Sequence, residues 1–436
     1  MIILIFPIKL DWNSKKIDNI IDKSKRFINI TKYIIKMAEL KENSMVLNKH
    51  ILLCIDCIDI NRVEEIMKHF CGIVFTDIKQ FDEHIIQPNT NIYICGDILK
   101  IYQTSINIIN RTTQIITEVS HNYEKIQIKT EIPIGMVPLN MYNVGVYFKQ
   151  FFNPDKDYFA HITKEHEFQA LTESNKGDNA LRKGIYLSKV AFEEKHRGYR
   201  FNLLRCSTNL KGPTENFRDT DNEIIDGVNN MVKDYFVQPV KLNHVLAQVY
   251  ENSFSGGKER KAKISTHSDK TKDMPHNGLI AFCTFYKDYN IKHVGDVLHK
   301  GQTIFTKLRF KLKNNIENMC PSFDITLFPN SVFVIPLSTN RLYTHEICPS
   351  ILPINMIPVR CGYIARLSNV EAVHKYGITY IDDAKHGYVP IDKEPTEKDI
   401  KHLKDLYFLE NATTNVIEYG DIHFSLNDGD HLQPKL

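Results

Sequence analysis

A histidine and an aspartate lie two residues apart in the segment 263–269, Lys-Ile-Ser-Thr-His-Ser-Asp. On an extended backbone, side chains two positions apart project from the same side, so His267 and Asp269 can reach one ion. With a second imidazole they would form the 2-His-1-carboxylate triad, which suits iron(II) and leaves coordination positions open. The pair alone carries little weight, because in a chain with 18 histidines a chance match at the surface is the commoner outcome.

A third ligand is available further along the chain. Residues 331–337 predict a buried strand, and residues 341–347 predict a second strand with Tyr343, His345 and Ile347 on one face. A lone histidine in such a place is more often a core residue with its hydrogen bonds satisfied. Its position downstream of the other pair makes His345 the candidate that completes the triad.

Two arginines follow in the strand-like segment 360–366, Arg-Cys-Gly-Tyr-Ile-Ala-Arg. Arg360 and Arg366 share one face, where an arginine is costly unless it meets an anion. Six strand steps separate their Cα atoms by about 20 Å, which leaves roughly 8 Å between the guanidinium groups. A five-carbon dicarboxylate fits this gap, and arginine binds carboxylates bidentately. Salt bridges to protein carboxylates are the alternative.

Together these residues resemble the AlkB family of nucleic-acid dealkylases. The family pattern is H-x-D, then R-L-x-x-H, then R-x-x-x-x-x-R, and it is met here by His267 and Asp269, by residues 341–345, and by Arg360 and Arg366. The segment 263–270 is similar to the family's K-L-S-x-H-x-D-K. Gln248 and Tyr250 stand where the family has its N-x-Y pair, and the resemblance covers roughly residues 143–370.

Three positions depart from the family pattern. Thr271 replaces the acid that approaches the exocyclic amine of the damaged base, and Asp273 is the nearest acid. Gly362 replaces an asparagine between the arginines, and Gln248 replaces the asparagine before the tyrosine. Co-substrate binding tolerates these changes, whereas the identity of the base does not follow from the resemblance.

The resemblance implies an α+β chain with a double-stranded β-helix, or jelly roll, flanked by helices. It also implies Fe(II) held by His267, Asp269 and His345, with 2-oxoglutarate bound by Arg360, Arg366, Tyr250 and Gln248. With dioxygen as the third reactant, the expected reaction is oxidative demethylation or hydroxylation of nucleic-acid bases, as in DNA repair. Succinate and carbon dioxide are the co-products, and demethylation releases formaldehyde.

Basic segments near the ligands favour an anionic substrate, so we expect DNA or RNA, single-stranded or with a flipped base. The segment 306–314 places Lys307, Arg309 and two further lysines on one strand face, which could track phosphates or could equally be a solvated outer face. The basic loop 258–263 lies directly before the ligands. Tyr186 and Tyr199 could stack on a base, or could be core or surface residues.

Two other functions stay open. A protein side-chain hydroxylase could use the same iron chemistry, and a non-catalytic jelly roll could bind a ligand without turnover. The paired arginines and the adjacent basic segments argue against the first. The intact ligand set argues against the second.

Outside the resemblance, residues 1–140 alternate strand-like and helix-like segments, which predicts a small α/β domain of unassigned role. The run 51–60 predicts a strand, and residues 61–70 predict a helix closed by Gly72. Cys54 and Cys57 form a C-x-x-C motif in that first run. Burial in a strand is the favoured interpretation, since no second pair follows at zinc-ribbon spacing.

Residues 371–436 predict a C-terminal extension with one helix, which Thr396 and Asp399 begin as a capping box. Nine scattered cysteines offer no disulfide framework and indicate a reducing compartment. The apolar start 2–8 predicts a strand and not a signal peptide, and no stretch approaches the length that spans a bilayer. We therefore expect a soluble intracellular protein of the cytoplasm or nucleus, of open oligomeric state. Its net charge of +3 permits a polyanionic partner without requiring one.

Overall fold

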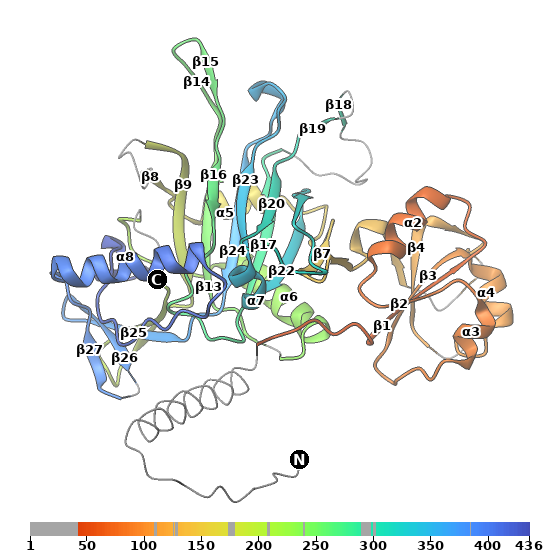
Figure 1. The fold of residues 1–436 in the computed structure, drawn as a ribbon, viewed down its shortest axis with the longest axis horizontal. Coiled ribbons are helices and arrows are strands. Elements are labelled where there is room, and N and C mark those ends of the chain that lie inside the picture. The colour runs from red at the N-terminus through yellow and green to blue at the C-terminus, as the bar shows by residue number, and fades with distance from the viewer. Residues whose placement is uncertain are drawn as a thin grey trace, which may run out of the picture. The chain divides into compact units, whose positions relative to one another are not determined.

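The computed structural model describes residues 42–436 except 109–110, 125, 127–129, 173–178, 207–209, 239, 289–297, 300–301 and 384 (Figure 1). Residues 43–436 form one compact unit, a mixed α/β chain rich in sheet. The predicted domain boundaries near residues 140 and 370 stay predictions, and the strand expected at 2–8 lies outside the described residues. None of the described helices is long and apolar enough to cross a bilayer.

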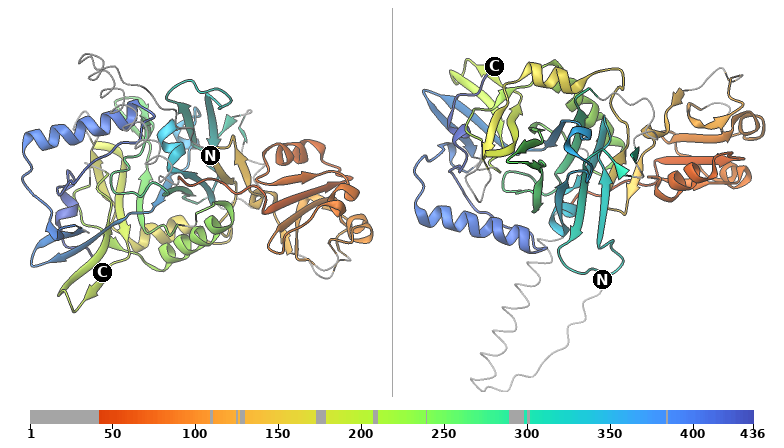
Figure 2. Two further views of the ribbon diagram at one scale, coloured as in Figure 1. Left: turned by 60° about the horizontal axis from the view of Figure 1, so that its bottom comes forward. Right: turned by 90° about the horizontal axis from the view of Figure 1, so that it is seen from above.

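The first part of this unit is a parallel sheet with the strand order β2-β1-β3-β4-β5. Its elements are β1 (His50–Ile55), α2 (Ile60–His69), β2 (Ile73–Phe75), α3 (Ile78–Glu83), β3 (Asn91–Asp97), α4 (Ile98–Thr104), β4 (Thr113–His121) and β5 (Thr130–Ile132). Alternate residues of β1 pack against α2 on one face and against α3 and α4 on the other, so every residue of the strand is buried (Figure 2).

Two details of this region differ from the prediction. The first strand ends at Ile55, and the helix that follows ends at His69 with Phe70 in the cap position, so Gly72 is not its cap. Gly72 instead lies where a Cβ atom would be 2.3 Å from the carbonyl oxygen of His50. The glycine is thus required by close approach of the backbone of β1.

A large sheet follows, with the strand order β12-β9-β13-β24-β17-β22-β7-β6 and β8 paired to β9. Its strands are β6 (Leu139–Met141), β7 (Gly145–Phe148), β8 (Gln169–Thr172), β9 (Asn179–Ser188), β12 (Glu215–Asn216), β13 (His244–Tyr250), β17 (Leu279–Tyr286), β22 (Ser331–Pro336) and β24 (Arg360–Arg366). Helices α5 (Tyr158–Glu165) and α6 (Asp219–Tyr235) cover one face through a shared apolar core. The other face is left for the site.

A four-stranded sheet lies against that other face. Its order is β16-β23-β20-β21, with β16 (Ile264–His267), β20 (Lys307–Leu312), β21 (Ser322–Thr326) and β23 (Tyr343–Cys348). Phe310 of β20 contacts Phe333 of the large sheet, with ring centroids 5.7 Å apart, inside one core shared by both sheets. Alternate residues of β23 are buried, as predicted, but residues 337–342 form the short helix α7 (Leu337–Leu342), so the strand begins at Tyr343 and not at Arg341.

The C-terminal extension contains more than the predicted helix. A fourth sheet has the order β10-β11-β25-β26-β27, with β10 (Ala191–Glu193), β11 (Gly198–Leu203), β25 (Val370–Lys375), β26 (Ile378–Asp383) and β27 (Gly387–Pro390). Helix α8 (Glu397–Ala412) begins as predicted, since the Thr396 hydroxyl accepts from the Asp399 amide at 3.2 Å. Shorter elements are β14 (Ser253–Ser255), β15 (Lys258–Arg260), β18 (Leu298–His299), β19 (Gln302–Thr303), η1 (Ile134–Met136), η2 (Ile354–Met356) and η3 (Asp428–His431).

Candidate metal centre and its cavity

The three expected ligand residues meet between the large and the four-stranded sheet. His267 at the end of β16 pairs in register with His345 of β23, and their ring centroids lie 4.4 Å apart. Oδ1 of Asp269 lies 3.6 Å from Nε2 of His267 and 3.7 Å from Nε2 of His345. One ligand atom of each residue thus lies within 4.8 Å of the other two, close enough to share one coordination sphere.

Hydrogen bonding and burial prepare both imidazoles to donate a lone pair. Nδ1 of His267 lies 2.9 Å from the carbonyl oxygen of Ser265, which can only accept, so Nδ1 carries the proton and Nε2 is free to bind a metal. Burial, and next the neighbouring His267, lower the pKa of His345 to about 3. This imidazole is therefore neutral at physiological pH, the form in which histidine binds metals.

Arg366 holds the ligand carboxylate. Its Nε and Nη2 atoms donate to Oδ2 of Asp269 at 2.9 and 2.6 Å. Burial alone would raise the pKa of this carboxyl group, but Arg366 and the two histidines outweigh it and hold the pKa well below its usual range. Asp269 is thus an anion with Oδ1 directed at the histidines. The prediction that Arg366 binds the co-substrate stays a prediction: its Nε and Nη2 atoms are occupied by Asp269, whereas its Nη1 atom has no hydrogen-bond partner among the described residues.

Asn340 fixes the backbone of the same aspartate. Its side-chain carbonyl accepts from the Asp269 amide at 2.8 Å, and its side-chain amide donates to the Asp269 carbonyl at 2.8 Å. From α8, Asn411 accepts from the amide of Ser268 at 2.7 Å. Neither residue was predicted from the sequence. Asn340 directly precedes the R-L-x-x-H motif, but it lies on the short helix α7, where the sequence predicted a strand from Arg341. Asn411 lies in no motif that would link it to the metal ligands.

The three candidate metal ligands line a cavity of about 1220 Å³. Arg360, Tyr250 and Gln248 line the same cavity. Arg360 is 2% exposed, and its Nε and Nη2 atoms have no hydrogen-bond partner among the described residues. Its guanidinium carbon lies 4.0 Å from the centre of the Tyr250 ring, and the Tyr250 hydroxyl donates to the Gln248 side chain at 3.0 Å. A buried cation with unused donors calls for an anion.

Strand alternation explains how β24 serves two purposes. Arg360, Ile364 and Arg366 line the cavity, whereas the core under α5 and α6 contains Cys361, Tyr363 and Ala365. Gly362 faces the same way as the arginines, and a Cβ atom there would lie 2.8 Å from Nη1 of Arg360 and 3.2 Å from the Tyr250 ring. The absence of a side chain at 362 therefore makes room for the Arg360 guanidinium.

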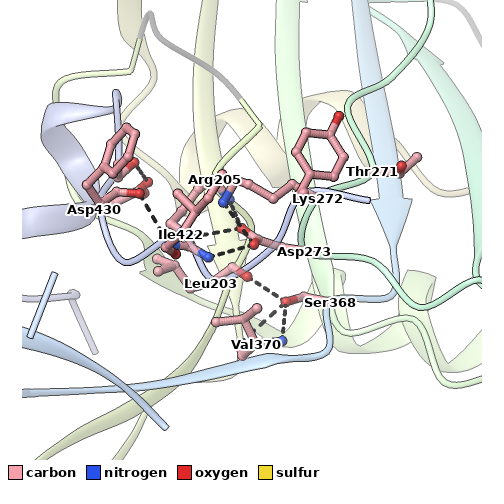
Figure 3. Close-up of polar contacts among 12 residues, drawn as sticks. Leu203, Arg205, Thr271, Lys272, Asp273, Ser368, Val370, Ile422 and Asp430 are labelled. Atoms are coloured by element: carbon pink, nitrogen blue, oxygen red, sulfur yellow. Dashed lines mark hydrogen bonds and ion pairs between the residues drawn. The ribbon is translucent and has the colours of Figure 1, made fainter. Parts of the chain in front are cut away.

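Two of the residues expected to contact substrate are engaged elsewhere. The amide and hydroxyl of Thr271 both donate to Glu410 of α8. The carboxylate of Asp273 is buried between Arg205, at 2.7 and 3.0 Å, and Lys272, at 2.9 Å (Figure 3). Neither residue lines the cavity. Both residues connect the chain after the metal ligands to the C-terminal extension. Thr271 does so through Glu410, and Asp273 does so through Arg205, which also donates to the carbonyl of Ile422.

The expected base-stacking tyrosines also lie outside the cavity. Tyr186 is 2% exposed in a small core, with its ring edge on His244 and its hydroxyl 3.2 Å from Sγ of Cys206. Tyr199 lies on β11 opposite His374 in the fourth sheet. Their positions give neither ring a free face on the cavity.

The basic stripe of β20 is neutralised by acidic neighbours. Arg309 donates to both oxygens of Asp324 at 2.7 and 3.0 Å, and Lys307 lies 4.0 Å from the same carboxylate. Lys311 pairs with Glu346 at 3.3 Å. Positive side chains also gather along the cavity, whose lining includes Arg260, Lys261, Lys263 and Lys270 against the acids Glu259 and Asp269. The Lys261 ammonium donates to the carbonyls of Ser350 and Leu352. The cavity wall, and not β20, is the surface suited to an anionic partner.

Comparison with known proteins adds little. No protein-family model matches the sequence, and no curated protein matches it. Among solved structures the chain is similar to OsALKBH1, with 12% identity, a TM-score of 0.31, and coverage of 51% of this chain and 96% of that one. It is also similar to a Pseudomonas putida prolyl-4-hydroxylase, with 9% identity, a TM-score of 0.29, and coverage of 51% and 91%. These scores are too low to establish a shared fold, so the geometry of the cavity must carry any functional conclusion.

Proposed function

We propose that this chain is an Fe(II)- and 2-oxoglutarate-dependent oxygenase whose residues 143–370 form a double-stranded β-helix. One observation carries the proposal: a His-Asp-His group and a buried arginine with unused donors line the same cavity. The first suits a divalent metal that keeps open positions, and the second suits a carboxylate. Together they match a ferrous ion and a keto-diacid.

The donor set fits Fe(II). His267 and His345 would each bind through Nε2, and Asp269 would bind through Oδ1, because its Oδ2 is occupied by Arg366. With Fe(II) bound, two neutral imidazoles and one carboxylate give the metal and its ligands a net charge of +1, which favours a further anionic ligand. When bound, the ion supplies open coordination positions and the electron chemistry by which 2-oxoglutarate and dioxygen react.

The cavity fits 2-oxoglutarate beside that ion. Arg360 would bind the distal carboxylate, and the Tyr250 hydroxyl, which donates to Gln248 in this structure, would turn its single proton to that carboxylate when the co-substrate binds. Arg366 keeps Asp269 ionised and turned toward the histidines, and its Nη1 atom would be available to the co-substrate. The apolar side chains of Leu246, Phe282 and Ile364 line the same space and limit the access of water.

Nucleic acid is the substrate class that the cavity favours. Positive side chains along its wall provide attraction for phosphates, and the resemblance of the ligand motifs points the same way. The proposed reaction consumes 2-oxoglutarate and dioxygen, adds one oxygen atom to the substrate, and yields succinate and carbon dioxide. If the oxidised carbon is an N-methyl group, the product releases formaldehyde.

Succinate release from 2-oxoglutarate with Fe(II) tests the proposal. We expect turnover in the wild type, loss of it in His267→Ala, and wild-type rates in His276→Ala, an exposed histidine outside the cavity. Methylated single-stranded DNA, methylated RNA and peptides, read by mass spectrometry, then identify the substrate class. No succinate from folded wild-type protein would refute an oxygenase, and stimulation by peptides alone would refute the nucleic-acid assignment.

A further inference from the structure

Three cysteines converge in the parallel sheet, far along the chain from the proposed oxygenase site. Cys54 lies on β1, Cys57 in the loop that leads to α2, and Cys95 on β3. Sγ of Cys95 lies 3.2 Å from Sγ of Cys54 and 3.7 Å from Sγ of Cys57. All three cysteines are free, and none lines the large cavity.

The topology of the sheet explains why they meet. In the order β2-β1-β3 the chain leaves β1 toward one side and returns to the other side as β3, so the strand order reverses between β1 and β3. Ligands of open α/β sheets bind outside the carboxyl ends of the strands at this kind of reversal. Cys54 and Cys95 are direct neighbours in the parallel ladder near those ends, and therefore point to the same side.

The backbone around the cluster is bent to bring the third sulfur close. Asp56 has φ of 50° and Gly96 has φ of 96°, both in the left-handed region, and the pairing of β3 with β4 shifts between Ile94 and Gly96. A Cβ atom at 96 would lie 1.8 Å from the Ile55 carbonyl oxygen and 3.0 Å from Sγ of Cys57. For the non-glycine Asp56 this conformation has a cost, and such conformations cluster at functional sites.

The sulfur positions match a thiolate metal site. Zinc–sulfur bonds of about 2.3 Å in a tetrahedron place neighbouring sulfurs about 3.8 Å apart. Cys54 is 6% exposed and Cys95 is fully buried, whereas Cys57 is half-buried. A disulfide would join only two of the sulfurs and would not explain why the third lies beside them.

We propose that Cys54, Cys57 and Cys95 bind one thiolate-preferring divalent cation of the zinc class, with a fourth position open to solvent beside Cys57. The cation would tie the loop between β1 and α2 to β3. Cys54 is a buried residue of β1 as the sequence predicted, whereas the same interpretation is corrected for Cys57, which lies beyond the end of β1. The third ligand escaped notice because it comes 38 residues after Cys57 and has no partner motif.

Cobalt(II) titration of the full chain under reducing conditions tests this site separately from the iron site, which has no sulfur ligand. We expect a thiolate-to-cobalt charge-transfer band that saturates at one equivalent. The band should be lost in Cys57→Ser and kept in Cys320→Ser, a half-buried cysteine elsewhere, and in His267→Ala. Circular dichroism establishes that Cys57→Ser is folded.

Alkylation supplies a second readout that does not depend on the variant. Zinc should slow iodoacetamide labelling of Cys57 in the wild type by about tenfold, and a chelator should restore it. Absence of the cobalt band from reduced, folded wild type would overturn the proposal. So would a band that survives Cys57→Ser, or labelling that zinc leaves unchanged.

Discussion

Both hydrogen bonds from Arg366 to Asp269 end on the same carboxylate oxygen, Oδ2, at 2.9 and 2.6 Å. The other oxygen, Oδ1, stays within 3.7 Å of His267 and His345. Arg366 thereby holds the carboxylate in place through Oδ2 and leaves Oδ1 available to bind a metal. Such partners of metal ligands affect metal affinity without touching the ion.

Arg366→Gln is expected to weaken metal binding by about 10- to 100-fold, because it leaves Asp269 without its charged partner. The loss of one member of a buried pair also destabilises the fold by about 3–5 kcal/mol. Calorimetric titration with Mn(II), an oxidation-resistant substitute for Fe(II), measures the first effect and urea unfolding the second. Arg309→Gln removes a surface arginine and is the control. It should change the free energy of Mn(II) binding and the free energy of unfolding by no more than about 1 kcal/mol each. Equal metal affinity in Arg366→Gln and the wild type would contradict the assigned role.

Arg360→Gln should have the opposite pattern. Metal affinity should stay unchanged, while the affinity for 2-oxoglutarate of the Mn(II)-loaded protein should fall by about 10- to 100-fold, as expected for a lost charge-assisted hydrogen bond. The same calorimeter measures both affinities. Retention of 2-oxoglutarate affinity would show that Arg360 does not bind the co-substrate.

Gly362→Ala tests whether the space beside Arg360 matters. A Cβ atom 2.8 Å from Nη1 of Arg360 must displace the guanidinium, so we expect weaker 2-oxoglutarate binding with little change in the free energy of unfolding. Gly227→Ala is the matched control, because its new Cβ atom would meet nothing closer than 3.7 Å. A Gly362→Ala variant that binds 2-oxoglutarate as the wild type does would argue against this packing.

His166 should make stability depend on pH. Its ring lies 2.7 Å from Asp221 and 3.1 Å from Glu215, and although burial opposes the charge, the two carboxylates raise the pKa to about 9. Because this exceeds the pKa of 6.5 expected in the unfolded chain, the stabilisation is complete below pH 6.5 and is lost as the pH rises through about 9.

Urea unfolding at a series of pH values measures this dependence. The wild type should lose on the order of 1–3 kcal/mol between pH 6.5 and 9 beyond any loss in His166→Gln. The variant should be less stable at pH 6.5 and should show a flatter profile. An equally steep profile in both proteins would mean that another group titrates.

The arrangement of charges also predicts which basic residues bind nucleic acid. Lys263→Gln, on the cavity wall, should weaken binding of a fluorescent single-stranded oligonucleotide and reduce the salt slope by about one. Lys307→Gln should leave the slope unchanged, since Asp324 lies beside that lysine. A weaker salt dependence in Lys307→Gln, with no change in Lys263→Gln, would show that the basic face of β20 binds the nucleic acid.

The sequence predicted those parts of the site that follow from strand geometry. Residues two apart on a strand share a face, so the common orientation of Arg360 and Arg366 followed from spacing. Asp269 lies beyond the end of β16, and its position beside His267 depends on Asn340 and Arg366. The buried face of β23 that carries His345 was confirmed for the same reason. Periodicity is a local property, and local properties can be inferred from a single sequence.

Partners from distant segments could not be predicted in this way. The pairing of Arg366 with Asp269 spans 97 residues, and the bond from Thr271 to Glu410 spans 139. Thr271 and Asp273 were assigned to substrate because they follow the metal motif, yet tertiary contacts with the C-terminal extension turn both away. The same holds for Cys95, whose role depends on the register of a parallel ladder.

The most direct test of the proposed iron and 2-oxoglutarate site is an anaerobic titration of the Fe(II)-loaded chain with 2-oxoglutarate, followed by visible absorption. A keto-diacid that chelates ferrous iron gives a metal-to-ligand charge-transfer band. We expect this band in the wild type at one iron per chain, its loss in folded His345→Ala, and its retention in His276→Ala. A folded wild type without the band, or a band that survives His345→Ala, would show that these residues do not form such a site.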